Sequence, residues 1–189
     1  MNSWEACALQ YNYPGESGAI EQQRATMRAQ STTFDSIIYP GLYAPSGFDM
    51  MSILIRIATR PNPLVHVGAI DSSCALILCD LQQPDQPIVY ASEPFYELTG
   101  YSHNEVLGRN CRFLQAPGGN VAPGSSRRYI NRDLLRRMRK SVDRNVELQL
   151  EVPNFRKNGT PFVNILTMIP VRWDSADFNY SVGLQCARD

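Results

Sequence analysis

The pattern of hydrophobic and polar positions divides the chain into an irregular beginning and a periodic remainder. Residues 1–40 are mostly polar and show no sustained period of 2 or 3.6, so we expect a flexible extension there. Ser46 and Asp49 have the spacing of a helix-capping box, and a helical pattern runs from there to the prolines at 61–63. Its apolar residues predict a short amphipathic helix with one stripe: Met50, Ile53, Leu54 and Ile57.

Two strands and a group of short helices are predicted next. Residues 73–80 form an apolar run, and a turn-like sequence separates it from a second run at Ile88–Tyr90. We expect the two runs to pair as a hairpin. The segment 93–115 is helical in character, with Gly100 and Gly108 as the expected end points of short helices.

The middle of the chain is predicted to be a loop followed by a longer helix. Residues 116–126 are so rich in Pro, Gly and Ser that they must form a loop. A helix is expected over about 131–142, because apolar residues again recur at helical spacing. Its stripe is Leu134, Leu135, Met138 and Val142.

The last third of the chain is predicted to form strands. Apolar residues alternate with polar ones at Val146, Leu148, Leu150 and Val152, which indicates a half-buried strand. Asn158–Gly159 is a strong hairpin signal and joins this strand to 161–171, and a last strand is expected near 180–186. Strands at both ends of a helical middle predict an α+β domain, an antiparallel sheet with helices on one face.

Composition and charge exclude several classes of protein. The 189 residues contain 18 Lys and Arg, 18 Asp and Glu, and 43% hydrophobic residues, which is typical of a globular protein and not of a disordered or generally basic one. No apolar stretch approaches the roughly 20 residues that cross a bilayer. The first twenty residues lack the pattern of a secretory signal, so we expect a reducing compartment, cytoplasmic or nuclear.

Metal and disulfide chemistry are not expected. The five cysteines form no CxxC pair, and an odd number argues against a disulfide framework. His66 and His103 lie far apart and near no acidic cluster, so the sequence indicates no metal site and no catalytic base.

The sharpest chemical feature is the segment Gly108–Gln115, with the sequence GRNCRFLQ. Cys111 lies between an amide and an arginine, which favours the thiolate form of a reactive cysteine. This signal alone is weak, because most single cysteines are small core residues. The eight residues, however, resemble the signature of LOV domains, the flavin-binding blue-light sensors of the PAS fold, without a gap.

The resemblance to LOV domains extends from about Cys74 to Cys186. Residues 87–101 resemble the second strand and first short helix of the family, and 154–164 resemble its central hairpin. Residues 43–48 and 60–63 are similar to the small fungal blue-light photoreceptors of the Vivid and Envoy type. This implies a flexible extension over 1–40, an N-terminal cap over 41–70 and a flavin-binding LOV domain over 71–189, with a five-stranded PAS sheet.

The family resemblance implies a photochemical role for Cys111. In LOV domains blue light excites a bound flavin, the cysteine adds to flavin carbon C4a, and the adduct reverts in the dark. Gln185 falls at the position of the glutamine on the family's last strand. An amide can donate or accept a hydrogen bond, so this side chain is expected to relay protonation of the flavin to the sheet.

A flavin pocket needs aliphatic walls and a few amides. Asn154 shares the parity of the apolar face of its strand, Asn164 shares that of Leu166 and Met168, and the first strand presents alternate residues in the same way. The resemblance places phosphate-binding arginines at 112 and 139. The expected flavin contacts are Ile77, Cys79, Ile88, Asn110, Arg112, Leu114, Gln115, Arg127, Arg128, Arg139, Asn154, Asn164, Leu166, Met168 and Gln185.

The length of the central loop favours FAD over FMN as the cofactor. Sixteen residues separate Gln115 from Arg132, more than in compact plant-type LOV domains, and they include Arg127 and Arg128. A longer loop can make room for the adenine half, and arginines can hold a diphosphate. FMN remains an alternative, as does an idle surface insertion.

Basic residues are concentrated in one segment, a feature that also occurs in nucleic-acid-binding proteins. Residues 127–144 contain eight basic and two acidic residues in a chain with a net charge of zero. Tyr129 is the one aromatic residue among them, so we interpret the surplus charge as a solvated helix face and expect no direct nucleic-acid binding.

The outward side of the first strand and the stripe of the N-terminal helix are both apolar, and each is expected to cover the other.

Three functional hypotheses remain on the sequence alone. The favoured one is a blue-light receptor that is not an enzyme and that signals through a light-dependent homodimer or a LOV- or PAS-containing transcription factor. A flavin-dependent redox enzyme or flavin-based redox sensor is the second, although the sequence marks no second redox group. A flavin-independent PAS interaction module is the third, and Cys111 with the three amides argues against it.

Overall fold

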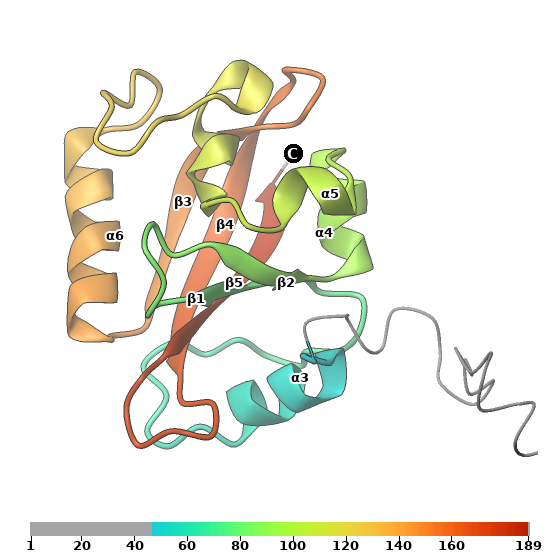
Figure 1. The fold of residues 1–189 in the computed structure, drawn as a ribbon, viewed down its shortest axis with the longest axis vertical. Helices are drawn as coiled ribbons and strands as arrows, with labels where there is room; N and C mark the ends of the chain where they lie inside the picture. The colour runs from blue at the N-terminus through green and yellow to red at the C-terminus, as the bar shows by residue number, and fades with distance from the viewer. Residues whose placement is uncertain (1–46, 189) are drawn as a thin grey trace, which may run out of the picture. The chain divides into compact units, whose positions relative to one another are not determined.

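A computed structural model describes residues 47–188, so the predicted extension over 1–40 and Ser46 lie outside the described residues. The described elements follow one another as short helices and strands (Figure 1). They are α3 (Met50–Ala58), β1 (Ala75–Asp80), β2 (Ile88–Ala91), α4 (Glu93–Thr99), α5 (His103–Val106), the 3-10 helices η1 (Cys111–Gln115) and η2 (Pro117–Gly119), α6 (Arg132–Arg144), β3 (Leu148–Phe155), β4 (Pro161–Val171) and β5 (Tyr180–Arg188).

The five strands form one antiparallel sheet in the order β2-β1-β5-β4-β3. The last strand of the chain therefore lies in the middle, between the first strand and β4. The predicted α+β class and the antiparallel pairing of 73–80 with 88–90 are confirmed. Among the described residues no helix is long and apolar enough to cross a membrane.

Both faces of β1 are covered, which explains its uninterrupted apolar run. Leu76 and Leu78 point to the side of α3, whereas Ile77 and Cys79 point to the side of α4 and η1. All six residues of the strand are buried. A strand buried on both faces carries apolar residues at consecutive positions instead of alternate ones.

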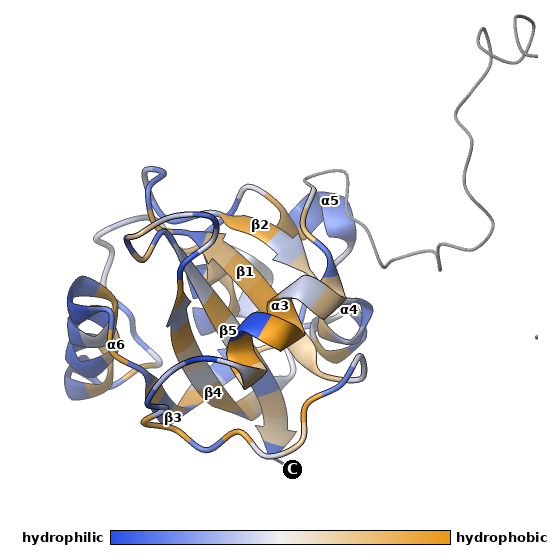
Figure 2. Ribbon diagram, turned by 90° about the horizontal axis from the view of Figure 1, so that it is seen from below, coloured by the Kyte–Doolittle hydropathy of each residue, from blue (hydrophilic) through white to orange (hydrophobic). Residues whose placement is uncertain are grey.

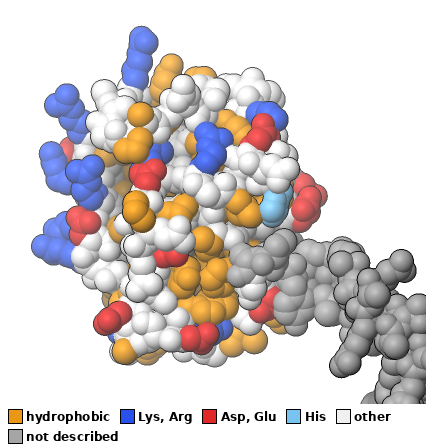
Figure 3. Space-filling view, in the orientation of Figure 1, with side chains coloured by type: hydrophobic (Ala, Val, Ile, Leu, Met, Phe, Trp, Pro, Cys, Tyr) orange, Lys and Arg blue, Asp and Glu red, His pale blue; other side chains and the backbone are white. Residues whose placement is uncertain are grey.

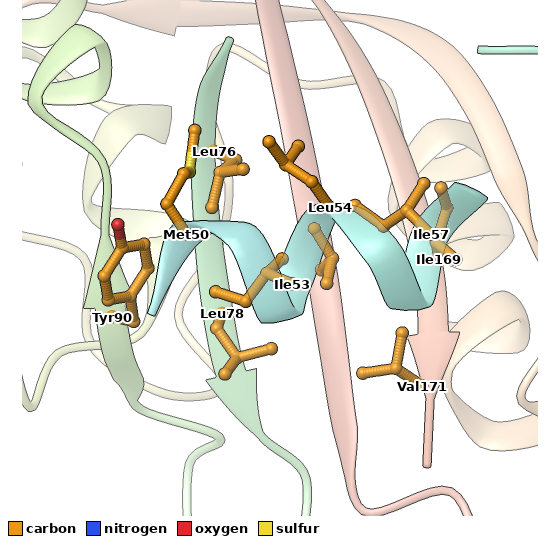
Figure 4. Packing of buried hydrophobic residues seen from close by; sticks show 10 residues of the cluster. Met50, Ile53, Leu54, Ile57, Leu76, Leu78, Tyr90, Ile169 and Val171 are labelled. Atoms are coloured by element: carbon orange, nitrogen blue, oxygen red, sulfur yellow. The ribbon is translucent and has the colours of Figure 1, made fainter. Parts of the chain in front are cut away.

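Helix α3 lies across the outer face of the sheet (Figure 2). Its predicted stripe is buried against side chains of β1, β4 and β5, among them Leu76, Leu78, Ile169 and Val171 (Figure 4). Each such side chain contributes roughly 1.5–3 kcal/mol when it leaves water. The helix begins after Asp49, whose Oδ1 accepts a hydrogen bond from the Ser52 amide at 2.7 Å. Asp49 is thus the N-cap, one turn later than the expected Ser46.

The other face of the sheet carries α4, α5, η1 and α6 (Figure 1). The helix α6 begins after Asn131, whose side chain accepts from the Asp133 amide at 2.8 Å. It ends at Asn145, which has the left-handed conformation. Gly159 turns the β3–β4 hairpin with φ of 85°, as the Asn-Gly signal predicted.

One expected strand residue is placed differently. Val146 precedes β3 and is 40% exposed, so its assignment to the apolar face of that strand is wrong. Its amide donates to the Ser141 carbonyl at 3.0 Å, and its carbonyl accepts from the Ser141 hydroxyl. These bonds tie Val146 to the end of α6, and the alternation with β3 is interrupted there.

A nearly buried ion pair ties the segment after α3 to the start of β3. Arg60 Nε lies 2.6 Å from Glu147 Oε1, and both side chains are about one-tenth exposed. Glu147 Oε2 accepts from the amides of Leu64 and Val65 at 2.9 and 2.8 Å. Burial raises the pKa of Glu147, but the hydrogen bonds from Arg60 and these amides outweigh it and hold that pKa below its ordinary value.

We predict that Glu147→Gln lowers the free energy of unfolding by about 2 kcal/mol at neutral pH, because the buried Arg60 loses a charged partner. The folded-state pKa is depressed, so this contribution is complete above the ordinary value of 4.5 and is lost as the pH falls through the lower folded-state value. Denaturant unfolding of both proteins over a pH series measures it.

The matched control for this prediction is Glu151→Gln, because Glu151 pairs with Arg188 while both side chains are about half exposed. That change should stay within about 0.5 kcal/mol. An equal loss in both variants, or a Glu147 effect that persists in acid, would contradict the role given to the Arg60–Glu147 pair.

Candidate functional site

A cavity of about 380 Å³ lies between the inner face of the sheet, η1 and α6. Its size is within the range of small-molecule pockets. The structure brings together most of the residues expected from the sequence around this cavity. They are Ile77, Cys79, Asn110, Cys111, Arg112, Leu114, Gln115, Arg127, Arg139, Asn154, Asn164, Leu166, Met168 and Gln185.

Two residues expected at the site do not line the cavity. Ile88 is fully buried in the apolar cluster that also contains Ile77, Cys79 and Leu114, but it does not reach the cavity wall. Arg128 is exposed, whereas the adjacent Arg127 turns inward. Arg127 and Arg128 lie at a turn, in which the Ile130 amide donates to the Arg127 carbonyl at 3.2 Å.

Several lining residues were not expected from the sequence. Three of them belong to the α6 stripe, which borders the cavity and also packs toward Leu150 and Val152 of β3. Gln86 lies in a turn with no periodic signal. Val152, which was expected on the same face of β3 as Asn154, lines the cavity as well. The unexpected lining residues include Leu81, Gln86, Leu135, Met138, Val142 and Ser181.

The conformation of η1 presents Cys111 to the cavity. Asn110 precedes the helix, and its Oδ1 accepts from the Arg112 amide at 3.0 Å. A hydrogen bond from the Cys79 thiol lowers the pKa of Cys111 most, and the charges of Arg112 and Arg127 act in the same direction against burial. Cys111 is therefore the thiol of this cavity that ionises more readily.

Three amides from three strands meet on the inner wall. Asn164 Nδ2 donates to Asn154 Oδ1 at 2.9 Å and lies 3.5 Å from Gln185 Oε1. All three side chains are buried, and Asn164 is only 1% exposed. The register explains the meeting, because Val152 pairs with Asn164 and Leu166 pairs with Gln185. Asn164 Oδ1 has no hydrogen-bond partner among the described residues.

Positive charge gathers at the other end of the cavity. Arg112 forms a two-pronged ion pair with Asp85, and Arg127 Nη1 donates to Gln115 Oε1 at 2.7 Å. Arg127 Nε is buried without a partner among the described residues. Burial and the nearby charges of Arg112 and Arg139 lower the pKa of Arg127. In Figure 3 the Lys and Arg side chains gather at the left, over α6 and the loop before it.

The cavity combines apolar walls with polar groups that lack hydrogen-bond partners among the described residues. Its walls are aliphatic, one end offers amide donors and acceptors with an unpartnered buried oxygen, and the other offers guanidinium groups with an unpartnered buried nitrogen. Buried polar atoms without partners are costly. A flat heteroaromatic ring with polar edge atoms and a phosphate tail supplies the missing partner at each end, and this is the composition of a flavin nucleotide.

A family model described as a PAS domain matches residues 73–185. The solved structure of the photo-excited blue-light photoreceptor Vivid is 61% identical, with a TM-score of 0.72 over 77% of this chain and 99% of that one. The chain belongs to the PAS domain family, in its LOV branch of blue-light photoreceptors. These relatives are photoreceptors and not enzymes.

Two further relatives extend the comparison. The light-state dimer of Vivid is 58% identical, with a TM-score of 0.72 over 78% of this chain and 99% of that one. The blue light receptor lreA of Aspergillus flavus is 46% identical over 147 residues, which are 78% of this chain and 17% of lreA. The chain thus spans less than a fifth of that curated relative. LOV photoreceptors bind a flavin chromophore, which fits the donor set of the cavity.

Proposed function

We propose that this LOV photoreceptor senses blue light through a reversible bond between Cys111 and carbon C4a of a flavin in the 380 Å³ cavity. The observation that carries this is the convergence of Cys111, the amides of Asn154, Asn164 and Gln185, and the basic end on one cavity. When bound, the flavin supplies a light-excited ring to which a thiol adds.

Different residues of the chain are proposed to bind different parts of the flavin. Aliphatic side chains of β1, β3, β4 and α6 enclose the ring and exclude water. Asn154 and Asn164 bind its polar edge, and the free Oδ1 of Asn164 accepts a ring N–H. Arg112 and Arg139 neutralise phosphate, while Asn110 fixes the start of η1 and so the position of Cys111.

Cys111 is tested by substitution. In Cys111→Ala the flavin should remain bound, because a thiol adds little to its affinity, whereas the absorbance loss that persists after blue light should disappear. Cys186→Ala is the matched control, since Cys186 is an exposed thiol on β5, and it should behave as the wild type. A persistent light-induced absorbance loss in Cys111→Ala would remove Cys111 from the proposed chemistry.

The cofactor is proposed to be FAD in large part. Gly124, Ser125 and Arg127 of the long loop line the cavity, which extends its basic end toward the loop. The unpartnered Nε of Arg127 is a donor for a second phosphate. A mononucleotide has one phosphate, and Arg112 with Arg139 would suffice for it.

Chromatography of the cofactor released from purified protein measures the FAD share. We expect FAD to form a major part in the wild type and to fall at least twofold relative to FMN in Arg127→Ala. Arg128→Ala is the matched control, because that side chain is exposed and should not change the ratio. Only FMN in the wild type, even with FAD supplied during folding, would reject this assignment.

The signal is proposed to leave through β5. Gln185 faces the cavity, and the preceding residue, Leu184, packs on the opposite face against the cluster that contains α3. Gln185 also pairs with Ala75 of β1, directly after the segment that leads from the cap. A change in the hydrogen bonds of Gln185 therefore displaces a strand that contacts both the cavity and α3.

The cap is proposed to leave the sheet, or to shift the packing of its helix α3 on the sheet, in the light. A second hollow of about 560 Å³ is lined by the end of the cap and the segment before β1, by α4, and by residues of β3, β4 and β5. Movement of the cap would widen this apolar surface for a second copy of the chain or for a LOV- or PAS-containing transcription factor. A location in the cytoplasm or nucleus belongs to the same proposal.

Size-exclusion chromatography and small-angle scattering of dark and lit protein over a concentration series test this output. We expect the lit wild type to be larger or more expanded. Dark Ile53→Glu should resemble it, because Ile53 is fully buried between α3 and the sheet. Gln185→Leu should form the adduct but change its size less. Ile55→Glu is the matched control, since Ile55 is 55% exposed on the same helix. Identical lit and dark wild-type profiles would contradict release of the cap.

A further inference from the structure

The basic side chains of the chain differ in whether they have a partner. Outside residues 127–144, every Lys and Arg of the described part pairs with a carboxylate or lies over an aromatic ring. Within that segment, Arg127 bonds to Gln115 and Arg136 pairs with Asp133. The other basic residues of the segment have no such partner among the described residues: Arg128, Arg132, Arg137, Arg139, Lys140 and Arg144. Uncompensated positive charge is therefore confined to one region of the described surface.

Basic residues recur at every fourth position of α6. We call these residues the basic row: Arg132, Arg136, Lys140 and Arg144. Residues four apart are neighbours on the surface of a helix, about 6 Å apart along its axis. The whole row is exposed, and Figure 3 shows Lys and Arg gathered over α6 and the loop before it. Like charges at this spacing destabilise a helix, and a bound anion would relieve their repulsion.

The opposite side of α6 is fixed against the rest of the domain. Leu135 and Met138 border the cavity and pack toward Leu150 and Val152 of β3. This packing holds the basic row toward solvent. Helix α3 packs on the other face of the sheet, against side chains of β1, β4 and β5. A partner bound at the basic row therefore leaves the cap free to move.

The surroundings of the basic row argue against a membrane or a single-stranded nucleic acid as the anion. A helix that binds a lipid surface presents apolar side chains beside its basic ones, whereas the apolar stripe of α6 faces the cavity and β3. Single strands are held by aromatic side chains that stack on the bases. Tyr129, the aromatic residue of this segment, instead packs edge-on against Phe155, with ring centroids 4.9 Å apart.

Two acidic residues interrupt the basic side of α6. Asp133 is exposed in the first turn of the helix, and Asp143 is exposed near its end. A nucleic-acid backbone is charged at every unit and would meet both carboxylates, whereas a polypeptide can place its acids between them. Arginine makes up most of the row, and its planar group binds a carboxylate through two parallel hydrogen bonds. This pattern of charges favours an acidic protein.

We propose that the basic row of α6 is a docking surface for an acidic helix of another protein, one that carries Asp or Glu at every fourth position. Two helices side by side have the same rise per residue, so acids at this interval match the row one for one. On the described helices of the chain itself, exposed acids at this interval are limited to Glu93 and Glu97 of α4. A separate protein is therefore the occupant, and its binding does not depend on the flavin.

The test uses the full chain purified with its flavin and a fluorescently labelled synthetic helical peptide with Glu at every fourth position. Fluorescence anisotropy measures the dissociation constant of the peptide. We expect binding that weakens by about tenfold between about 50 mM and about 300 mM NaCl, because salt screens exposed charges. A peptide of the same composition with its residues in scrambled order should bind about fivefold more weakly, because its acids no longer lie on one side.

Two triple variants locate the surface. The first removes charge from the basic row: Arg132→Gln, Lys140→Gln and Arg144→Gln. It should weaken peptide binding by about tenfold and leave the flavin absorption spectrum unchanged, because none of these side chains lines the cavity. The matched control removes the same charge from exposed residues elsewhere: Lys157→Gln, Arg172→Gln and Arg188→Gln. It should change the dissociation constant by less than about twofold.

Double-stranded DNA and vesicles that contain anionic phospholipid are titrated as competing probes at the same salt concentration. Tighter binding of either probe than of the peptide would identify a phosphate-binding surface and overturn the proposal. A peptide that does not bind, a scrambled peptide that binds equally well, or an equal loss of affinity in the two triple variants would overturn it as well.

Discussion

The central position of β5 in the sheet joins the cavity on one face to the cap on the other. The last strand of the chain pairs on one side with β1, which follows the cap, and on the other with β4, which carries Asn164. Alternate residues of β5 therefore face two different environments. Gln185 is buried at the cavity and Leu184 packs toward α3, so a strand of nine residues connects the site with the outer face.

The two covered faces of the sheet have different chemical characters. The outer face is covered by an apolar helix, and the interface is closed by Met50, Ile53, Leu54 and Ile57 (Figure 4). The inner face combines apolar walls with amides, thiols and arginines, several of whose polar atoms have no partner among the described residues. Clusters of buried apolar side chains pack on both faces, whereas the cavity on the inner face leaves room for a ligand.

Periodicity predicted those parts of the fold in which neighbouring positions face different surroundings. The stripe of α3, the alternation of β3 and β4, and hence the burial of Asn154 and Asn164, followed from spacing alone. Periodicity does not report where a regular segment ends, so Val146 was placed in β3 although hydrogen bonds to Ser141 hold it in a turn. Ile88 was expected at the cavity, but it is fully buried within the apolar cluster that also contains Ile77 and Cys79 and does not reach the cavity wall.

Contacts that depend on long-range backbone pairing could not be predicted from the sequence. Cys79 and Cys111 line one cavity although they lie on different elements, and the bonds of Ile88 with Gly108 and Arg109 fasten the segment before η1 beside β2. No local pattern encodes these bonds. The Arg60–Glu147 pair and the position of Gln86 at the cavity could not be predicted either, because they join residues far apart in the sequence. The direction of Arg127 and Arg128 was equally open, because a loop without regular structure gives neighbouring side chains no common face.

The proposed photochemistry requires that the cavity hold a flavin against Cys111 and that light convert this flavin reversibly. It is tested by the absorption spectrum of the purified wild-type chain before, during and after blue-light illumination. We expect the blue band of an oxidised flavin, its loss under illumination and its full return in darkness. A protein that retains no flavin when it is supplied during folding, or one whose flavin band is unchanged by light, would show that the proposed photochemistry is wrong.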